Sequence, residues 1–451
     1  MRILFGLLGV LLLLLCAAVA MLPRAALPES SWTMQVSLWR RFGLRIGVPS
    51  AIRFATSPLG ARLLDGHSVA TRYGRISVAR GPEGVRLRCA PCTILVPAVS
   101  REPLVFAAVD LDVVRRGQML TGMAHIGQVA VRIEGTLTDS HLAGKFELGD
   151  TPVRDIYALF APAIPELKRA RITGQLAVKG TFSLPDGSLT FAPRLHGFAV
   201  GGLNTERLAY GRVVHVCRAS DGTSRLRAIG EGGSDWIPMK ALGKLLPRAV
   251  IASEDARYFR HPGYDLVEAL DALEANVNAD AIVRGGSTLT QQLARNLFLG
   301  QERTLVRKLR ETLYAVEMER TLGKERILAL YLNTVDWGPG VCGAWEAART
   351  YFGKPPARLR AEEAAWLASI LRNPHAAWRD EYGAGQVKAR RVAWVVYRMP
   401  GLRRAERVAA LRRPLCFRGP SAGPASELKP GATAHHSVAC KAAQSGRPDL
   451  R

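Results

Sequence analysis

The sequence predicts an α+β protein with several domains: an N-terminal transmembrane helix, a β-rich middle domain and a mainly helical domain after it. Three observations lead to this prediction. The chain begins with an apolar run, continues with a long stretch in which apolar and polar residues alternate, and then changes to apolar residues at helical spacing. Its 451 residues are enough for more than one domain and a large core.

The N-terminal part, residues 1–24, contains an almost wholly apolar run from Ile3 to Leu22. A run of this length can cross a bilayer as a helix. A cleaved secretory signal is the alternative, because Ala18-Val19-Ala20 has the small-x-small form of a cleavage site. We favour an uncleaved anchor. In both cases the rest of the chain leaves the cytoplasm.

Residues 32–210 are expected to form a β-rich domain, because their apolar positions mostly recur with a period of two. Val109, Leu111 and Val113, for example, alternate with two aspartates. A helical interruption is predicted at residues 153–168. This domain is distantly similar to the strand-rich repeats of AsmA-type envelope proteins, which hold lipid in troughs. A β-rich spacer or a module that binds a partner protein is the alternative.

Turns and cysteines add detail to the β-rich domain. Pro185-Asp186-Gly187 predicts a turn between two strands. Cys89 and Cys92 have redox-motif spacing but lie among strand-like runs, so we predict a structural disulfide in an oxidising compartment. The pairing of the other cysteines is left open, and no Cys/His set has zinc spacing. Residues 201–235 predict a strand pair and a linker.

The charge is strongly basic, with 62 Lys and Arg against 38 Asp and Glu and a formal net charge of +24. This balance favours an anionic partner, either nucleic acid or a membrane surface. No zinc finger, basic zipper or ribonucleoprotein motif is present, so a nucleic-acid partner is disfavoured. A genome-wide preference for arginine is the alternative explanation of the charge.

The helical domain, residues 236–400, carries the candidate chemistry. An apolar run ends at the adjacent acids Glu254 and Asp255, and His261 follows. Burial beside a second carboxylate raises the pKa of one acid, as a general base requires. About thirty residues later Gly285-Gly286 precedes a helix start, where backbone N–H groups can face an anion. This order suggests chemistry on a phosphorylated substrate.

Two helices follow the glycine pair. Thr288 and Gln291 have capping-box spacing, and Leu289, Leu293 and Leu297 mark a buried stripe. The next helix is predicted over residues 304–322, ending at Gly323, and its buried positions are Leu305, Leu309, Leu313 and Val316.

Four segments of this domain resemble the motifs of glycosyltransferase family 51, the peptidoglycan glycosyltransferases. Residues 254–263 resemble the Glu-Asp-x-x-Phe-x-x-His-x-Gly motif with Tyr258 in place of Phe, and residues 285–296 match Gly-Gly-Ser-Thr-x-Thr-Gln-Gln-Leu-x-x-Asn throughout. Arg307-Lys308-x-x-Glu311 is similar to the third motif. Residues 324–333 resemble the fourth, with Ala329 where Glu is common, a departure we interpret as affecting local packing.

The resemblance covers residues 247–374, with an extension to 398, and implies a lysozyme-like fold and a set of site residues. Glu254 is the implied general base and Glu311 the second acid, which with a substrate phosphate is expected to hold a divalent cation such as Mg²⁺ or Mn²⁺. No organic cofactor is implied. His261 is expected to orient the first motif rather than transfer protons. The implied substrate-binding residues are Asp255, His261, Gly286, Ser287, Thr288, Gln291, Gln292, Arg295, Asn296, Arg307 and Lys308.

The implied reaction polymerises lipid II into glycan strands, by inverting transfer from an undecaprenyl-pyrophosphate-linked chain to an acceptor sugar hydroxyl. The resemblance also implies that residues 264–283 form a membrane-dipping lobe. The protein is expected in the bacterial inner membrane as a single-pass protein with its catalytic domain on the periplasmic side. Other cell-wall synthesis proteins are the expected partners of the β-rich region.

The C-terminal residues 419–451 are polar and rich in small residues, which predicts disorder. No Ser-x-x-Lys, Ser-x-Asn and Lys-Thr-Gly set follows the helical domain, so we expect an enzyme without transpeptidase activity. Two other functions remain: a lysozyme-like hydrolase, because glycosidases also use two carboxylates, and a non-catalytic envelope protein that binds lipid or a partner. The basic residues beside Glu311 argue against the first, and the nearly intact motifs against the second.

Overall fold

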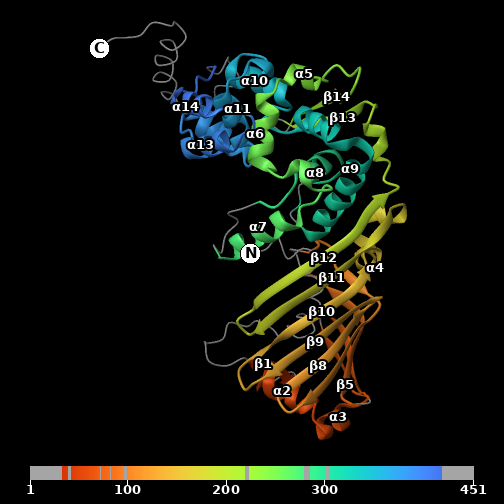
Figure 1. The fold of residues 1–451 in the computed structure, drawn as a ribbon. Helices are drawn as coiled ribbons and strands as arrows, with labels where there is room; N and C mark the ends of the chain where they lie inside the picture. The colour runs from red at the N-terminus through yellow and green to blue at the C-terminus, as the bar shows by residue number, and fades with distance from the viewer. Residues whose placement is uncertain are drawn as a thin grey trace. The chain divides into compact units, whose positions relative to one another are not determined.

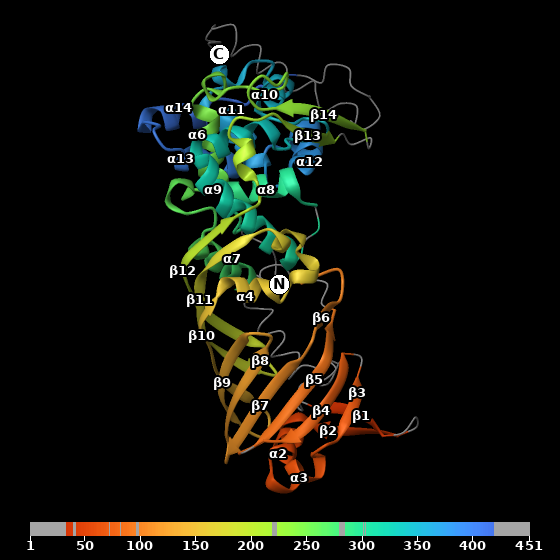
Figure 2. The same ribbon diagram turned by 90° about the vertical axis from the view of Figure 1, so that its right-hand side faces the viewer.

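The computed structural model describes residues 33–38, 42–71, 73–81, 83–95, 99–218, 223–278, 285–300, 302 and 304–418. The chain divides into two compact units, residues 1–203 with 302–310 and residues 204–301 with 311–451. Figures 1 and 2 show their elements from two sides. The mixed α+β class is confirmed, with a β-rich N-terminal part and a helical C-terminal part.

The first unit is built on a ten-stranded antiparallel sheet in the order β12-β11-β10-β9-β8-β7-β5-β4-β3, with β6 paired to β5. A separate hairpin joins β1 (Thr33–Leu38) to β2 (Phe42–Gly47). The strands of the sheet are β3 (Ser68–Thr71), β4 (Gly74–Arg80), β5 (Val85–Ile94), β6 (Leu104–Phe106), β7 (Val109–Arg116), β8 (Met119–Ile126), β9 (Val129–Leu137), β10 (Leu142–Pro152), β11 (Arg171–Leu184) and β12 (Ser188–Gly201).

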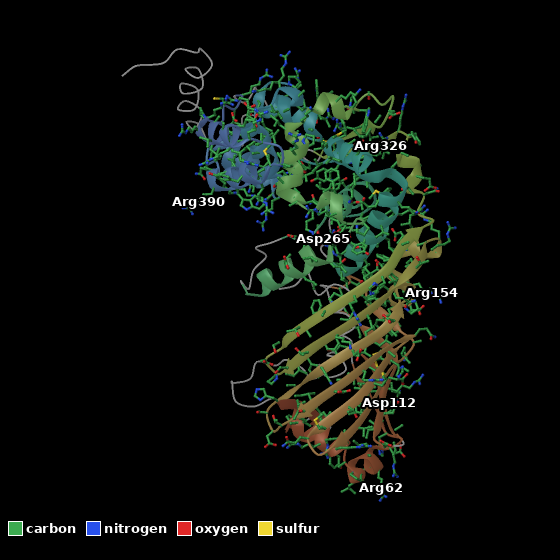
Figure 3. All side chains as sticks on the ribbon, in the orientation of Figure 1. Arg62, Asp112, Arg154, Asp265, Arg326 and Arg390 are labelled. Carbon is green, nitrogen blue, oxygen red and sulfur yellow. A yellow bond between two sulfur atoms is a disulfide. The ribbon has the colours of Figure 1, made fainter. Side chains whose placement is uncertain are left out.

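The predicted alternation is confirmed on β7 at Val109 and Leu111, which are buried, whereas Val113 is only half-buried. The aspartates between them point to the other face, and Asp112, labelled in Figure 3, lies 2.6 Å from Arg86 of β5. One face of the strand therefore supplies core and the other carries ion pairs between strands. The predicted turn at residues 185–187 is also confirmed, since it joins β11 to β12. The predicted Cys89–Cys92 disulfide is present on β5.

Short helices complete this unit. They are α2 (Val48–Ala55), α3 (Pro58–Leu64), α4 (Val153–Ala158) and the 3₁₀ turns η1 (Ala161–Ala163) and η2 (Pro165–Lys168), and the last three confirm the predicted helical interruption. Ile52 of α2 packs against a core cluster of Leu120, Leu137 and Leu142.

The first unit also holds the start of the long helix α9 (Leu305–Thr334). The hydroxyl of Tyr157 donates to the carbonyl of Leu309 over 3.2 Å. Glu166 is buried, and both its oxygens accept from the Arg310 guanidinium over 2.7 to 3.1 Å. A bidentate pair of this kind fixes geometry as well as charge. The first turns of α9 therefore belong to the β-rich unit.

The second unit is mainly helical. Its α-helices besides α9 are α5 (Met239–Leu242), α6 (Leu245–Glu254), α7 (Leu266–Asn278), α8 (Leu289–Phe298), α10 (Ala344–Phe352), α11 (Ala361–Ile370), α12 (Pro374–Ala377), α13 (Ala389–Arg398) and α14 (Arg404–Arg412). Shorter helical turns are η3 (Thr205–Leu208), η4 (Tyr258–Arg260), η5 (Pro356–Arg358) and η6 (Trp378–Gly383). The predicted strand pair is confirmed as β13 (Val213–Arg218) and β14 (Ser224–Ile229).

Helix α9 differs from the prediction in its length. The sequence indicated an end at Gly323, and the backbone does leave the helical region there, with φ 73° and ψ 165°. A second helical stretch then continues to Thr334, so α9 is kinked rather than ended.

The β13–β14 hairpin is joined to the helices of its unit by a disulfide and a buried arginine. Cys217 of β13 pairs with Cys342, a pairing that the sequence left open. The Arg227 guanidinium donates to the carbonyls of Asn333, over 3.1 Å, and Cys342, over 2.5 Å. The hairpin is therefore part of the helical unit rather than of a linker.

No helix of the described residues is long and apolar enough to span a bilayer. The predicted anchor, Ile3 to Leu22, and the predicted disordered tail, residues 419–451, lie outside the described residues.

Candidate active site

The site is organised around Glu254, the last residue of α6. This helix packs into the unit through buried residues such as Leu246, Ala249 and Val250, and it ends because Asp255 takes a non-helical conformation with φ −158° and ψ 71°. The helix end leaves Glu254 half-buried, whereas Asp255 is buried. The two adjacent carboxylates thus have different surroundings.

Each oxygen of the Glu254 carboxylate faces one side-chain donor. The hydroxyl of Ser253 lies 3.1 Å from Oε1, and the amide Nε2 of Gln292 lies 3.2 Å from Oε2. Gln292 is itself held by Tyr331 of α9, whose hydroxyl donates to its Oε1 over 2.9 Å. Helices α6, α8 and α9 together therefore hold the carboxylate of Glu254.

Burial raises the pKa of the Glu254 carboxyl above its usual range, and this is the largest effect on it. The hydrogen bonds from Gln292 and Ser253 and the charges of Arg391 and Arg372 oppose the effect in part. A carboxylate with a raised pKa that is half open to solvent can accept a proton near neutral pH, as a general base must.

Asp255 contacts protein donors rather than an open surface. It accepts from Nε2 of His261 over 3.0 Å and from the backbone N–H of Leu289 over 2.9 Å. Nδ1 of His261 in turn accepts from the N–H of Gly263 over 3.2 Å. Asp255 therefore connects the first motif to the positive N-terminus of α8, where an acidic group is favourable. Asp255 and His261 therefore contact groups of the first motif and of α8.

The predicted capping box at the start of α8 is confirmed. The Thr288 hydroxyl accepts from the N–H of Gln291, and the Gln291 side chain accepts from the N–H of Thr288, both over 3.2 Å. Thr288 also donates to the carbonyl of Gly263 over 2.7 Å. Leu289 and Leu293 of the predicted stripe are buried, but Leu297 is only half-buried. Thr288 and Gln291 therefore fix α8 against the first motif.

The remaining residues of the second motif lie just before α8 or in its last turn. A Cβ on Gly286 would lie 3.0 Å from the Cα of Ala269 in α7, so only glycine fits without a shift. Ser287 and Asn296 are half-buried. The Nε of Arg295 is buried and has no hydrogen-bond acceptor among the described residues. A buried guanidinium N–H of this kind is suited to bind an anionic oxygen.

The third motif lies on the first turns of α9. Arg307 is buried and its Nε donates to the carbonyl of Glu302, while Lys308 is half-buried. These two residues fall in the segment grouped with the first unit, and Glu311 falls in the second. Glu311 is almost fully buried.

Glu311 is the candidate ligand for a divalent cation. No group of three or more His, Cys, Asp or Glu side chains suited to hold a metal occurs among the described residues. Mg²⁺ needs no such group, because it commonly binds through one or two carboxylates together with substrate phosphates and water. A single carboxylate at Glu311 fits that mode of binding.

The fourth motif supports the first. The ammonium of Lys324 donates to the carbonyl of His261 over 2.7 Å and pairs with Glu319 at 2.8 Å. Ala329, at which the motif departs from its common form, is buried, and its carbonyl accepts from Asn333 over 2.8 Å. The position is structural, in agreement with the interpretation from the sequence.

Sequence reasoning missed Ser253, Tyr331 and Arg391. Ser253 directly precedes Glu254 and Tyr331 lies within the fourth motif, so both could have been found from the motifs. Arg391 follows Ser253 by 138 residues and lies outside every motif, so no local signal points to it.

Figure 3 labels another carboxylate of this unit, Asp265, which directly precedes α7. Its Oδ1 accepts from the N–H of Glu268 over 3.1 Å, and its Oδ2 pairs with Arg257 at 3.2 Å. Asp265 therefore caps α7 rather than taking part in the site around Glu254.

Part of the chain is similar to known proteins. Residues 223–400 match the family described as Transglycosylase. A biosynthetic peptidoglycan transglycosylase of Nitrosomonas eutropha is 48% identical over 139 residues, which are 31% of this chain and 57% of the relative. The protein of the same name from Thiobacillus denitrificans is 41% identical over 160 residues, 36% of this chain and 68% of the relative. A solved structure, penicillin-binding protein 1A from Haemophilus influenzae, matches with 19% identity and a TM-score of 0.24 over 46% of this chain and 21% of its own.

The match spans between 57% and 68% of the length of these two relatives. The family match over residues 223–400 covers the segment that holds Glu254, Gln292, Glu311 and Arg391. On the strength of the identity and of the share of the Thiobacillus relative that is covered, the chain belongs to the transglycosylase family of peptidoglycan biosynthesis.

Proposed function

We propose that this protein is a peptidoglycan glycosyltransferase that polymerises lipid II into glycan strands. The observation that carries the proposal is the Glu254 carboxylate, half-buried, with a raised pKa and with one donor on each oxygen. Arg295, in the last turn of α8, has a buried N–H without an acceptor among the described residues, and both Arg295 and Glu254 influence the phenol of Tyr331. A base next to an anion-binding group is what transfer from a pyrophosphate donor requires.

In the proposed reaction Glu254 takes the proton of the acceptor sugar hydroxyl. The oxygen of that hydroxyl forms a bond to the anomeric carbon of the donor chain as the bond from this carbon to the lipid pyrophosphate breaks. A single displacement inverts the configuration, and the pyrophosphate leaves with the bonding electron pair. Gln292, held by Tyr331, keeps one oxygen of Glu254 in place during the proton transfer.

Negative charge grows on the leaving pyrophosphate, so donors directed at it supply the main electrostatic stabilisation. Arg295 is the candidate supported by its unpaired N–H. The family motifs add Arg307 and Lys308 for this charge, and Ser287 and Asn296 for sugar and phosphate oxygens. Asp255, His261 and Thr288 position the second motif through the contacts that connect the first motif to α8, and Gln291 donates to Thr312 of α9.

Glu311 would hold a divalent cation such as Mg²⁺ or Mn²⁺, together with pyrophosphate oxygens. A bound cation supplies positive charge at the leaving group.

The expected setting is the periplasmic side of the bacterial inner membrane, with the apolar run at the N-terminus as a single anchor. Helix α7 is our candidate for a membrane-dipping segment, because Val267 is exposed and Leu266 and Leu270 are half-buried. The rest of the predicted lobe, residues 279–283, lies outside the described residues. For the β-rich unit we propose a lipid- or partner-binding role, of the kind the AsmA-type resemblance implies, with cell-wall synthesis proteins as candidate partners.

Purified full-length protein in detergent, given lipid II, tests the proposed reaction. We expect glycan polymer from the wild type and a loss of at least about 100-fold in rate from Glu254→Gln, because the amide cannot accept the proton. Absence of polymer from folded wild-type protein beside an active control enzyme would reject the proposed reaction.

The same preparations should be incubated with preformed glycan strands. Release of shorter fragments by the wild type, without any polymerisation, would favour the hydrolase alternative, which also relies on carboxylates.

A further inference from the structure

Arg391 of α13 contacts Ser253, the residue directly before Glu254. Its Nη2 lies 3.1 Å from the hydroxyl of Ser253 and 3.4 Å from the carbonyl of the same residue. The Ser253 hydroxyl lies 3.1 Å from Oε1 of Glu254 and 3.0 Å from the carbonyl of Ala368. Arg391 thus reaches the proposed base through one intervening hydroxyl.

A serine hydroxyl has one proton and two acceptor positions. When Arg391 donates to this oxygen, the proton of Ser253 must point to one of its two acceptors, Glu254 or the carbonyl of Ala368. The positive charge behind the hydroxyl also polarises it, which strengthens its hydrogen bond to a carboxylate.

The position of Arg391 is itself well fixed. Its guanidinium carbon lies 4.2 Å from the ring centroid of Trp394, on the same helix. Arg398 approaches the same ring at 4.5 Å. The Nε of Arg391 is buried without an acceptor among the described residues. The desolvation of this group costs free energy, which the packing of the side chain must offset.

From this geometry we infer that Arg391 is a positioning residue for the proposed reaction: it orients the Ser253 hydroxyl toward Glu254 and holds a positive charge behind the base. The inference rests on the proposed function for its catalytic meaning. The arrangement has two arms, Arg391–Ser253 on Oε1 and Tyr331–Gln292 on Oε2, so each oxygen of Glu254 has a donor that is itself held.

Other charged and titratable groups also influence Glu254. Arg372, which follows α11, acts in the same direction as Arg391, and the phenol of Tyr331 on α9 interacts with Glu254 as well. Because Arg372 stays in place, removal of Arg391 should weaken the positive field at Glu254 without abolishing it.

The first test is the pH dependence of kcat and KM for lipid II polymerisation by Arg391→Met. Without the positive charge of Arg391, Glu254 should stay protonated to higher pH. The acid limb of the kcat–pH profile should therefore move to higher pH by about 0.5 pH units or more. We expect kcat at the optimum to fall about 10-fold and KM to stay within about 3-fold. An acid limb that coincides with that of the wild type would contradict the inference.

Two matched variants distinguish a specific effect of Arg391 from a general effect of changing a charged residue on α13. Arg390→Met removes the neighbouring charge on α13, which is exposed and is not among the charges that shift the pKa of Glu254, and should leave the pH profile unchanged. Arg391→Lys keeps the charge and should return the acid limb of the kcat–pH profile most of the way to its wild-type position.

A double variant tests the role of Ser253. In a Ser253→Ala background, Arg391→Met should reduce kcat by a clearly smaller factor than in the wild type, since the intervening hydroxyl is gone. Full additivity would count against the proposed orientation of Ser253.

A titration that needs no turnover tests the inference even if lipid II is not polymerised. Full-length protein labelled with ¹³C at the Glu side-chain carboxyl is titrated by NMR, and the Glu254 signal is identified by its absence in Glu254→Gln. We expect this signal to titrate at higher pH in Arg391→Met than in the wild type and in Arg390→Met. Equal titration in all three would refute the inference whatever the outcome of the polymerisation assay.

Discussion

Glu254 destabilises the fold when its carboxyl group is ionised. Its pKa is raised in the folded protein, mainly by burial, so ionisation is less favourable there than in the unfolded chain. The unfolded carboxyl has a pKa of about 4.3. Below that pH the residue is neutral in both states and the raised pKa has no effect on stability. Above the folded pKa the ionised carboxylate lowers the free energy of unfolding.

Because ionised Glu254 lowers the free energy of unfolding, replacing it with a neutral residue should stabilise the protein at neutral pH. The variant should have a higher Tm than the wild type at pH 7.5, and the difference should shrink as the pH falls to about 4. Thermal unfolding followed at three pH values measures it. Glu325→Gln, an exposed position on α9, is the control and should show no such pH-dependent difference. A Glu254→Gln variant less stable than the wild type at pH 7.5 would contradict the prediction.

At the scale of residues, the sequence located the groups of the site that lie close together in the chain. Glu254, Asp255, His261 and the Thr288 capping box follow from short patterns, because each pattern reflects local geometry. Arg391 could not be found in this way. Its contact with Ser253 depends on how α13 packs against α6, and such packing between distant helices leaves no periodic trace in the sequence.

At the scale of elements, helix α9 shows both the reach and the limit of periodicity. The buried positions Leu305, Leu309 and Leu313 were predicted correctly from their spacing. The kink at Gly323 was predicted as an end, because glycine after a helical pattern usually stops a helix. That the chain resumes a helix beyond the kink follows from the buried residues of the fourth motif, such as Ile327 and Leu330, which pack inside the unit.

Gly323 allows a prediction for this element. Its φ of 73° and ψ of 165° lie in a region open almost only to glycine. A Cβ at this position would meet no atom within 4 Å, so a substitution is penalised by the backbone conformation alone. Gly323→Ala should lower the free energy of unfolding by about 1–3 kcal/mol.

Urea unfolding checks the Gly323 prediction. Gly149→Ala is the matched control, because a Cβ there also meets nothing within 4 Å and the φ of Gly149 is not in the left-handed region. The control should change stability by well under about 1 kcal/mol. Similar losses for both variants would show that the kink does not require glycine.

At the scale of the whole molecule, two disulfides differ in what they constrain. Cys89 and Cys92 are 3 residues apart, whereas Cys217 and Cys342 are 125 apart and tie the β13–β14 hairpin to the helical unit. A crosslink that closes a long loop restricts the unfolded chain more strongly than one that closes a short loop. The pair Cys217→Ala and Cys342→Ala should therefore cost about 2–5 kcal/mol of stability.

Cys89→Ala with Cys92→Ala is the comparison, and its cost should be clearly smaller. Urea unfolding of both double variants, with and without reductant, measures the difference. The reductant should lower the midpoint of the wild type and leave the Cys217/Cys342 variant much less affected. Equal costs for the two pairs would mean that loop length does not decide their contributions.

The division of the chain was predicted only in outline. Alternation and helical spacing separated a β-rich part from a helical part, because each period reflects which residues a strand or a helix buries. No local pattern indicated that residues 204–235 belong with the helices, because a disulfide and the buried Arg227 hold them there. The role of the β-rich part, including its similarity to AsmA-type proteins, stays a prediction.

The first turns of α9 have a consequence for the modularity of the chain. Residues 302–310 cluster with the β-rich unit, held by Tyr157 and Glu166, so the boundary between the units cuts the third motif between Lys308 and Glu311. No single cut in the backbone separates the two units. A fragment that begins at residue 204 keeps Arg307 and Lys308 but loses the residues that hold their helical turn. Any engineered exchange of the β-rich half must therefore carry with it a matching surface for this turn.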